Sequence, residues 1–324
     1  MKQDYVISID FGGTKILSAI INSSEGIVAR VKKATMTTDT KKNLPLLITQ
    51  SINELIMQTS IPESSIKAVC IGAPGSVDPR TGIIGLAPNL GLKHYNLKDE
   101  MQKYTNIPVL VENDVNLAAL GIHGFGEAKG LSNVLVVFVG TGIGGGLILN
   151  GKIYRGASFI AGEIGHIHIM DNGPICGCGK KGCFEAVASR TAIVRDLSKS
   201  IRLGKASRLA KLVKTKTRIK SKSLLDALIA GDSLTVKQVA KASETIGKTL
   251  AGVNNLLNLD MIILGGGVIE AMKKYTMPTI KQSFKDFSFR DSAKTTKIIA
   301  TKIADESALW GGIELAREFL DIEV

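Results

Sequence analysis

A strand, a glycine-rich turn and a second strand follow one another twice in this sequence, and this repeat limits the folds that the chain can adopt. The first copy spans residues 5–21, with its turn at residues 11–14. The second copy begins about 130 residues later and spans residues 134–149, with its turn at residues 140–146. Two similar hairpins at such a distance indicate two related halves.

The rest of the chain fits an α/β fold made of two such halves. The length of 324 residues suits two domains better than one. Apolar runs and helical periodicity predict further elements, namely strands at 27–31, 67–71, 107–111 and 261–264, and helices at 43–58, across 190–258 and at about 305–320. We expect an N-terminal domain of residues 1–115 plus 303–324, and a second domain of residues 116–302. The two would enclose a ligand cleft.

Three of the four cysteines and one histidine form a compact pattern, H-x₉-C-x-C-x₄-C, made of His166, Cys176, Cys178 and Cys183. In a cytosolic protein such a cluster is more typical of metal binding than of disulfides. Three thiolates and one imidazole satisfy tetrahedral Zn²⁺ and leave no open position, so the predicted ion is structural. The alternative is free thiols in a glycine-rich loop. We predict that His168 is not a ligand and that Cys70 is a core residue.

The glycine runs predict phosphate-binding turns. Residues 140–145 match G-x-G-x-x-G, but a strand follows instead of the helix that dinucleotide binding requires. The sequence has no P-loop. Successive glycine N–H groups can still form a concave anion site, with a threonine hydroxyl as a further donor. Asp10 lies beside the first turn and suits a hydrated Mg²⁺. A third run follows at residues 265–267, and the alternative for each run is an ordinary tight turn.

The net charge of +12 invites a nucleic-acid interpretation, but its distribution does not favour one. Residues 199–222 contain ten Lys or Arg and no acid, so the rest of the chain carries only +2. This segment predicts either a solvated basic helix or a site for an anionic partner. The helix would bury one stripe, consisting of Ile201, Leu203, Leu209, Leu212 and Val213.

The sequence shows neither a secretory signal nor an apolar run long enough to cross a bilayer. We therefore expect a cytoplasmic protein without a membrane partner.

Six segments together resemble the ROK family of bacterial sugar kinases and repressors, within the actin–hexokinase–Hsp70 superfamily. They are Asp10-Phe-Gly-Gly-Thr-Lys15, Glu112-Asn-Asp-Val-Asn116, Gly140-Thr-Gly-Ile-Gly-Gly-Gly146, Ala161-Gly-Glu-Ile-Gly-His166, Cys176-Gly-Cys-Gly-Lys-Lys-Gly-Cys-Phe-Glu185 and Leu264-Gly-Gly-Gly267. The resemblance covers nearly the whole chain. It implies two actin-like, ribonuclease H-like domains and an ATP-dependent hexose kinase, with glucose and its 6-hydroxyl as the expected acceptor.

The resemblance also implies a role for each matching residue. Asp114 matches the catalytic base, which would accept the proton of the sugar hydroxyl. The implied sugar-binding residues are Asn89, Asn113, Asp114, Glu163, His166 and Glu185. His166 would serve zinc and sugar through its two ring nitrogens. The implied ATP and phosphate residues are Asp10, Gly12, Gly13, Thr14, Lys15, Gly140, Thr141, Gly142, Gly265, Gly266 and Gly267. ATP, Mg²⁺ and structural Zn²⁺ are the implied cofactors, and a homodimer or homotetramer is the implied assembly.

Two departures from glucokinase-like sequences leave the sugar open. Many such proteins have Asn-Gly where this chain has Gly156-Ala-Ser158-Phe159, and an aromatic residue where Gly91 follows Asn89-Leu90. Fructose, mannose, N-acetylmannosamine and N-acetylglucosamine are the alternative acceptors. Another alternative is a sugar-sensing ROK regulator without a DNA-binding domain, since the first strand begins at Tyr5. A third is a non-kinase member of the superfamily, which the cysteine motif argues against.

Overall fold

The computed structural model describes residues 3–12, 15–35, 40–87, 90–303 and 305–324. The chain forms two compact units. Unit 1 contains Met1–Leu131, Gly146–Gly162 and Lys302–Val324, and unit 2 contains Ser132–Gly145 and Glu163–Thr301. The first boundary between units thus falls after Leu131 rather than near residue 115. Because compactness does not show which segments fold alone, the domain ranges given above stay a prediction.

Unit 1 is built on a five-stranded sheet with strand order β3-β2-β1-β4-β8. The first three strands pair antiparallel, and β1, β4 and β8 are parallel. The bounds are β1 (Tyr5–Phe11), β2 (Lys15–Asn22), β3 (Gly26–Ala34), β4 (Ile66–Ala73) and β8 (Val109–Asn113). A second, three-stranded sheet has the order β5-β6-β7, made of β5 (Val77–Asp78), β6 (Ile83–Ala87) and β7 (Leu92–Asn96). The predicted strands of this half are confirmed, whereas the small sheet was not predicted.

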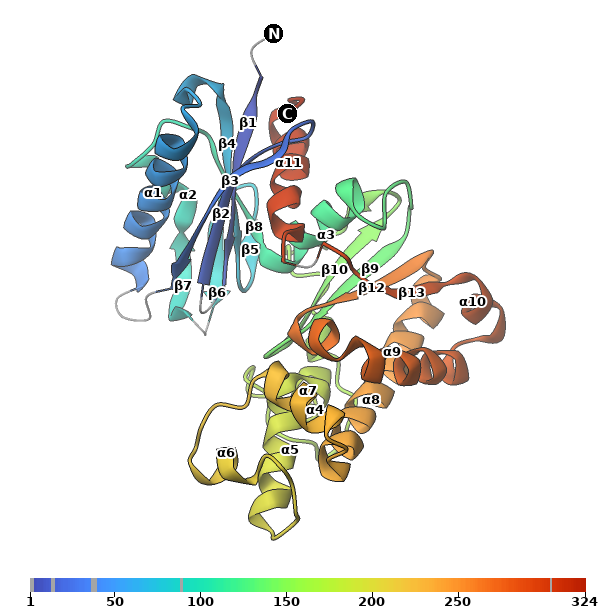
Figure 1. The fold of residues 1–324 in the computed structure, drawn as a ribbon. Coiled ribbons are helices and arrows are strands. Elements are labelled where there is room, and N and C mark those ends of the chain that lie inside the picture. The colour runs from blue at the N-terminus through green and yellow to red at the C-terminus, as the bar shows by residue number, and fades with distance from the viewer. Residues whose placement is uncertain (1–2, 13–14, 36–39, 88–89, 304) are drawn as a thin grey trace. The chain divides into compact units, whose positions relative to one another are not determined.

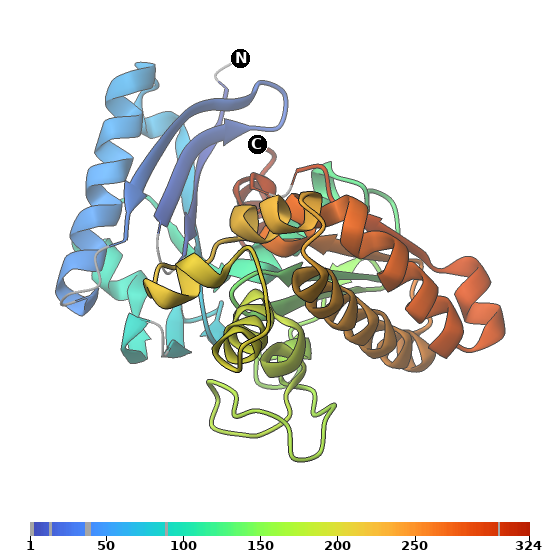
Figure 2. The same ribbon diagram turned by 60° about the horizontal axis from the view of Figure 1, so that its bottom comes forward.

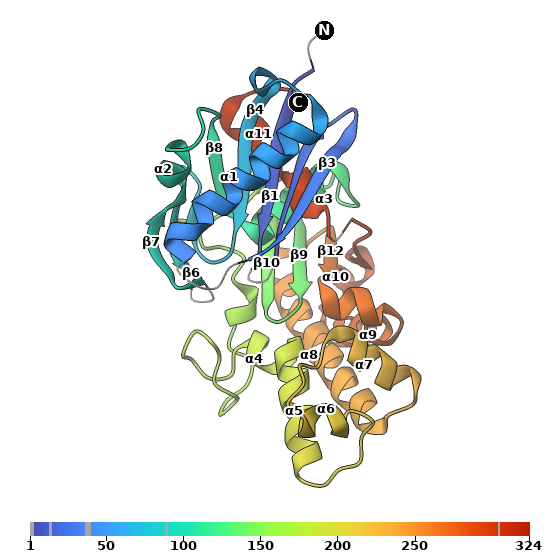
Figure 3. The same ribbon diagram turned by 60° about the vertical axis from the view of Figure 1, so that its left-hand side comes forward.

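Helices cover both faces of the larger sheet of unit 1 (Figures 1 and 3). Their bounds are α1 (Thr40–Thr59), η1 (Glu63–Ser65), α2 (Leu97–Gln102), α3 (Asp114–Phe125) and α11 (Ser307–Leu320). Successive side chains of a strand alternate between faces, so Ile7 and Ile9 pack in the core that also contains Ile48 of α1. Between them, Ser8 points to the other face, where its hydroxyl donates to the Ala308 carbonyl of α11. Each buried aliphatic side chain stabilises this core by roughly 2 kcal/mol.

Glycines allow α3 and α11 to pack closely. A β-carbon on Gly311 of α11 would lie 1.8 Å from the Leu117 carbonyl oxygen of α3. A β-carbon on Gly121 of α3 would lie 1.9 Å from the Ser307 carbonyl oxygen. Both distances are far below van der Waals contact, so these two positions accept only glycine at the observed spacing.

The second five-stranded sheet has the order β11-β10-β9-β12-β13 and thus the same topology as the first. In both sheets a hairpin partner lies on one side of the first strand and parallel strands lie on the other. The bounds are β9 (Val134–Val139), β10 (Ile143–Leu149), β11 (Lys152–Ile153), β12 (Met261–Gly265) and β13 (Lys297–Ala300). The predicted repeat is therefore confirmed. Strand β10 starts at Ile143, four residues before the predicted start, because the glycines at 144–146 belong to the strand rather than to the turn.

Strand β11 and the end of β10 belong to unit 1, because Gly146–Gly162 are part of that unit. The other elements of unit 2 are helices, namely η3 (Ile164–His166), α4 (Phe184–Ala188), α5 (Arg190–Arg202), α6 (Ala210–Lys214), α7 (Ser221–Ile229), α8 (Ser233–Leu257), α9 (Gly267–Phe287) and α10 (Arg290–Thr295). Figure 2 shows α8 and α9 side by side. Gly247 permits this packing, since a β-carbon there would lie 2.5 Å from the Ile280 carbonyl oxygen. In the part of the chain that the structure describes, no helix is both long and apolar enough to span a membrane.

The basic segment 199–222 does not form the single helix that we considered. It contains the end of α5, the short α6 and the start of α7, with Gly204 at a φ of 89° just after α5. Ile201, Leu209 and Val213 are buried as predicted. Leu203 is 74% exposed, so its predicted place in the buried stripe was wrong. The glycine ends the helical periodicity and thereby turns Leu203 toward solvent.

Candidate functional site

The junction between β8 and α3 holds the predicted base and its neighbour in a defined geometry. Asn113 caps α3, because its side-chain oxygen accepts hydrogen bonds from the backbone N–H groups of Val115 at 2.9 Å and Asn116 at 3.0 Å. Its side-chain nitrogen donates to the Gly75 carbonyl at 3.0 Å. Asp114 is the first residue of α3 and is half-buried. A carboxylate at this position is stabilised by the positive end of the helix dipole.

The first glycine turn follows β1. The Gly12 N–H donates to the Lys15 carbonyl at 2.9 Å, and the Lys15 ammonium lies 3.4 Å from Asp305. Asp10 is the last residue but one of β1. Burial raises the pKa of its carboxyl, with Asp305 adding to the effect and Lys15 opposing it. A nearby cation would therefore stabilise the ionised form. Gly13 and Thr14 lie outside the described residues.

The second and third glycine runs lie next to each other in unit 2. The Gly140 N–H donates to the Gly142 carbonyl at 2.9 Å and closes the turn between β9 and β10. Gly266 has a φ of 84° and lies between β12 and α9. A β-carbon on Gly266 would lie 2.8 Å from backbone atoms of Val139, the residue before the turn. Glycine is thus required where the two backbones meet, at the N-terminal end of α9.

Arg190, which sequence reasoning missed, braces the second turn. Its backbone N–H donates to the Gly140 carbonyl at 2.9 Å, and its guanidinium donates to the Thr141 hydroxyl. The same guanidinium lies 3.4 Å from the Ser221 hydroxyl of α7. The Thr191 hydroxyl donates to the Thr141 carbonyl at 2.7 Å. A single arginine at the start of a helix gives no local sequence signal, because its partners come from distant segments.

A cavity of about 330 Å³ opens beside Thr141. Among the described residues that line it, four are cationic and none is acidic; the cationic ones are Arg190, Arg202, Lys216 and Arg218. Burial lowers the pKa of the Arg190 guanidinium, and the charge of Arg218 lowers it further. Like charges without a carboxylate partner favour an anionic occupant. Part of the basic segment thus faces a cavity.

The four predicted metal ligands come together in unit 2. We call His166, Cys176, Cys178 and Cys183 the cysteine cluster; their ligand atoms all lie within 4.8 Å of one another. The sulfurs of Cys178 and Cys183 are 3.7 Å apart, and the Cys176 sulfur lies 3.7 Å from Nδ1 of His166. Two thiolates bound tetrahedrally to one Zn²⁺ are about 3.8 Å apart, whereas a disulfide measures about 2 Å. The four residues therefore fit a tetrahedral metal ion.

The loop that carries these ligands has little regular structure. Figure 2 shows it as the yellow-green loop at the bottom of the view. Two isolated bridges, His168 with Cys183 and Ile175 with Lys181, connect it internally. Burial raises the pKa of the Cys176 thiol to about 12. A cation is needed to hold such a thiol as thiolate. His168 lies outside this group of ligand atoms, so its non-ligating role stays a prediction, whereas Cys70 is fully buried as predicted.

Two acidic residues flank the cysteine cluster. Oε2 of Glu163 lies 3.7 Å from Nε2 of His166, while Nδ1 of His166 faces Cys176. The two ring nitrogens thus face different partners. Oε1 of Glu185 lies 3.6 Å from the Cys176 sulfur, and its Oε2 accepts the Ile143 N–H at 2.9 Å. Glu185 therefore connects the cluster to the strand that follows the second glycine turn.

The two loops that depart from glucokinase-like sequences are both in unit 1. Phe159 has a φ of 59°, a backbone conformation that favours glycine, and the Arg80 guanidinium lies 4.4 Å from its ring centre. Asp78 holds Arg80 through two hydrogen bonds from the guanidinium. Asn89 lies outside the described residues, and the nearby Gly91 has a φ of 64°.

The predicted site residues therefore belong to both units. Unit 1 carries Asp10, Gly12, Lys15, Asn113 and Asp114, whereas unit 2 carries the second and third glycine runs, Glu163, Glu185 and the cysteine cluster. In unit 1 these residues gather at the first glycine turn and at the β8–α3 junction. In unit 2 they gather at the two adjacent glycine runs and around the cysteine cluster.

The comparisons with known proteins identify the family. The profile of the ROK family matches residues 6–319. This chain belongs to the ROK family. It is 32% identical to a glucokinase from Halalkalibacterium halodurans, over 98% of this chain and 96% of that protein. The predicted resemblance is thereby confirmed.

Solved structures and further relatives give the fold and the range of functions. A ROK glucokinase from Streptomyces griseus, solved with glucose and AMPPNP, is 30% identical, with a TM-score of 0.81 over 97% of this chain and 99% of that chain. The predicted actin-like α/β fold is confirmed by this match. A xylose repressor from Caldicellulosiruptor bescii is 27% identical over 96% of this chain and 77% of its own length. The relatives thus support a sugar kinase and also include repressors.

Proposed function

We propose that this protein is an ATP-dependent hexose kinase and that glucose, at its 6-hydroxyl, is the preferred acceptor. The observation that carries the proposal is the placement of Asp114. It is a half-buried carboxylate at the start of α3, in a chain that matches glucokinases over nearly its whole length. The glucose bound to the Streptomyces griseus relative supports the choice of sugar.

In the proposed reaction, Asp114 accepts the proton of the sugar hydroxyl. The hydroxyl oxygen attacks the γ-phosphorus of ATP, the bond from that phosphorus to the β,γ-bridging oxygen breaks, and ADP leaves. Asn113 uses its oxygen for the α3 cap and one N–H for Gly75, so its second N–H is the group offered to the sugar. On unit 2, Glu163, Nε2 of His166 and Glu185 are the proposed acceptors and donors for the remaining hydroxyls.

The donor side of the proposed site is the pair of glycine runs in unit 2 together with Arg190. The Thr141 hydroxyl, the Arg190 guanidinium and the backbone at the start of α9 all offer donors to phosphate oxygens. We expect the cationic cavity beside Thr141 to take part of the nucleotide. Arg190→Met would then raise the KM for MgATP by about tenfold with little change in the KM for sugar.

Two metal ions complete the proposal. Asp10 is the residue that would face hydrated Mg²⁺, which neutralises the phosphates of bound ATP. The cysteine cluster would hold structural Zn²⁺ and keep Glu163, His166 and Glu185 in place. We also infer a cytoplasmic homodimer or homotetramer from the family resemblance.

The test is to measure ADP release with MgATP against glucose, fructose, mannose, N-acetylmannosamine and N-acetylglucosamine, with a sugar-free control. We expect sugar-dependent turnover with one strong preference, for glucose. Preference for another sugar would correct the acceptor. Absence of sugar-dependent turnover by folded, zinc-loaded protein would overturn the kinase proposal.

A sugar-sensing regulator is the second candidate, and the repressors among the relatives favour it. Calorimetry with the same sugars and with xylose separates the two functions. A regulator would bind xylose or a hexose tightly without hydrolysing or transferring phosphate, whereas a kinase would turn over each sugar that it binds productively.

A further inference from the structure

A buried carboxylate precedes the predicted base in the chain. Glu112 is the last residue but one of β8, and only 1% of its side chain is exposed. Its Oε1 accepts the backbone N–H of Asn113 at 2.8 Å and the side-chain N–H of Asn116 at 3.1 Å. Two neutral donors do not offset the cost of burying a full negative charge. Glu112 therefore depends on a cation.

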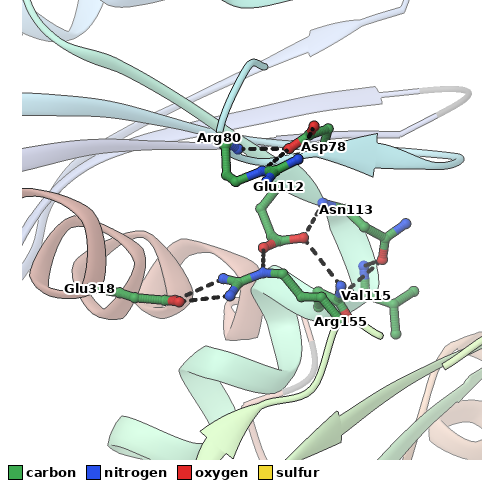
Figure 4. Close-up of polar contacts among 8 residues, drawn as sticks. Asp78, Arg80, Glu112, Asn113, Val115, Arg155 and Glu318 are labelled. Atoms are coloured by element: carbon green, nitrogen blue, oxygen red, sulfur yellow. Dashed lines mark hydrogen bonds and ion pairs between the residues drawn. The ribbon is translucent and has the colours of Figure 1, made fainter. Parts of the chain in front are cut away.

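Arg155 is that cation. Its Nε donates to Oε2 of Glu112 at 2.6 Å, and its Nη1 and Nη2 donate to the two oxygens of Glu318 at 2.6 and 2.7 Å (Figure 4). The Arg155 side chain is 12% exposed, and its guanidinium also lies 5.6 Å from the Phe319 ring centre. We call Glu112, Arg155 and Glu318 the arginine cluster. The planar guanidinium donates to two carboxylates at once through N–H groups in fixed directions. A lysine ammonium has no such fixed arrangement of donors.

The arginine cluster acts on the segment that contains Asp114. The Asn113 backbone is held by Glu112, and the Asn113 side chain holds both the first turn of α3 and Gly75. Asp114 is the next residue, so the direction of its carboxylate depends on the peptide that Glu112 anchors. Figure 4 shows the contacts running from Glu318 through Arg155 and Glu112 to Asn113.

We propose that Arg155 is a positioning residue for phosphoryl transfer, which acts by neutralising and orienting Glu112 and thereby fixes the direction of the Asp114 carboxylate. This inference rests on the proposed kinase function. Arg155 touches no reacting atom in this account. Without it, Glu112 would take up a proton, which weakens its hydrogen bond to the Asn113 N–H, or turn toward solvent, which breaks that bond. A misplacement of about 1 Å at a reacting group costs about 100-fold in rate.

The chain contains a matched control on α11. Arg317 also contacts two carboxylates, Glu314 at 2.8 Å and Glu323 at 3.4 Å, and lies 5.6 Å from an aromatic ring centre, that of Phe125. Among the contacts described for it, none involves the β8–α3 junction. Arg317→Met therefore removes a similar set of interactions from the same unit without touching Glu112.

The test compares Arg155→Met, Arg155→Lys and Arg317→Met with the unmodified chain by steady-state kinetics of sugar-dependent ADP release. We expect Arg155→Met to lower kcat by about 100-fold while the KM for sugar changes less than about threefold. Arg155→Lys should recover part of that kcat, and Arg317→Met should keep it. Circular dichroism checks that each variant is folded.

Several outcomes would overturn the inference. One is a kcat of folded Arg155→Met within twofold of that of the unmodified chain. Another is an equal loss of kcat in Arg317→Met. The third is a change in Arg155→Met that affects only the KM for sugar. If Arg155→Met does not fold, Arg155→Lys decides, and a kcat within twofold of the unmodified chain overturns the inference. No sugar-dependent turnover by the unmodified chain overturns the proposed function and this inference together.

Discussion

The arginine cluster of unit 1 and the cysteine cluster of unit 2 hold neighbouring candidate site residues in place by different means. In the arginine cluster, each charged group has its partner in the chain, because two carboxylates share the guanidinium of Arg155. In unit 2, three sulfurs and one imidazole point toward one another, and the cysteine cluster contains no cationic side chain to balance three thiolates.

The difference follows from the local structure. The arginine cluster draws on a strand end, a helix and the segment after β11, all anchored in a regular core. The cysteine cluster belongs to a loop that has only a short 3₁₀ turn and two isolated bridges. The backbone hydrogen bonds described for this loop close local turns and bridges, such as that from the Cys176 N–H to the Lys180 carbonyl, and none belongs to an extended strand or a long helix. Its geometry should thus depend also on the ion that its side chains bind. We therefore expect unit 1 to keep its site geometry without metal and unit 2 to lose it.

The largest expected effect comes from removing one ligand of the cysteine cluster. Cys178→Ser leaves three ligands for the metal, and we expect less than one zinc per chain and a loss of activity of about 100-fold or more. Elemental analysis and ADP release measure the two quantities. Cys70→Ala, in the core of unit 1, should retain zinc. A zinc-free Cys178→Ser protein with full activity would contradict the role of the cluster.

Zinc chelation sharpens the comparison between the units. Hydrogen exchange followed by mass spectrometry should show faster exchange in the loop of residues 167–183 after chelation, with unchanged protection of β8 and α3. The loop is expected to respond because its hydrogen bonds close only local turns and bridges, and the metal would tie these together. Unchanged exchange in both segments would mean that the loop holds its geometry by itself.

A smaller effect is expected at the two ends of the arginine cluster. Glu112→Gln breaks a buried ion pair and should lower the free energy of unfolding of unit 1 by about 3 kcal/mol. The same substitution at Glu318, which is 39% exposed, should cost less than about 1 kcal/mol. Urea unfolding followed by tryptophan fluorescence reports on unit 1, because Trp310 of α11 is the single tryptophan of the chain. Equal costs at both positions would contradict the burial argument.

A further small effect tests the regular part of unit 2. Asp232 caps α8 by accepting the Thr235 N–H at 2.8 Å, and it also accepts the Arg208 N–H at 2.6 Å. Burial raises the pKa of its carboxyl, but these hydrogen bonds outweigh burial and leave the pKa below its ordinary value. Asp232→Asn keeps the cap without the charge and should cost about 1 kcal/mol at pH 7.

The sign of this pH dependence follows from the lowered pKa. Ionised Asp232 contributes stability above its unfolded pKa of about 4, and the contribution is lost as the pH falls through the lower folded pKa. Thermal unfolding by circular dichroism should therefore show a constant difference between Asp232→Asn and the unmodified chain from pH 7 to pH 5. The difference should shrink below about pH 4. A difference that grows on acidification would contradict the assigned shift.

Local patterns made much of the fold and the cysteine cluster predictable. Apolar runs between glycine turns gave both hairpins, and the four metal ligands lie within a short stretch of sequence. The glycines of β10 were misassigned to a turn because they carry no side chains that would mark a strand. The two-residue strands β5 and β11 are too short to show a period.

The long-range contacts were not predictable. Arg155 and Glu112 are 43 residues apart, and Arg155 and Glu318 are 163 residues apart. Their pairing depends on how a sheet, a loop and the last helix pack, and no local pattern encodes that. The same reason applies to Arg190 and Thr141, which meet only because α5 begins beside the second glycine turn.

The most direct test of the account is to measure glucose-dependent ADP release by the unmodified chain and by Asp114→Asn, both zinc-loaded and with saturating MgATP. We expect sugar-dependent turnover by the unmodified chain, and a kcat at least about 100-fold lower for Asp114→Asn at similar stability. Equal rates for the two proteins would contradict the role of Asp114 as base, and no sugar-dependent release by either would contradict the kinase proposal itself.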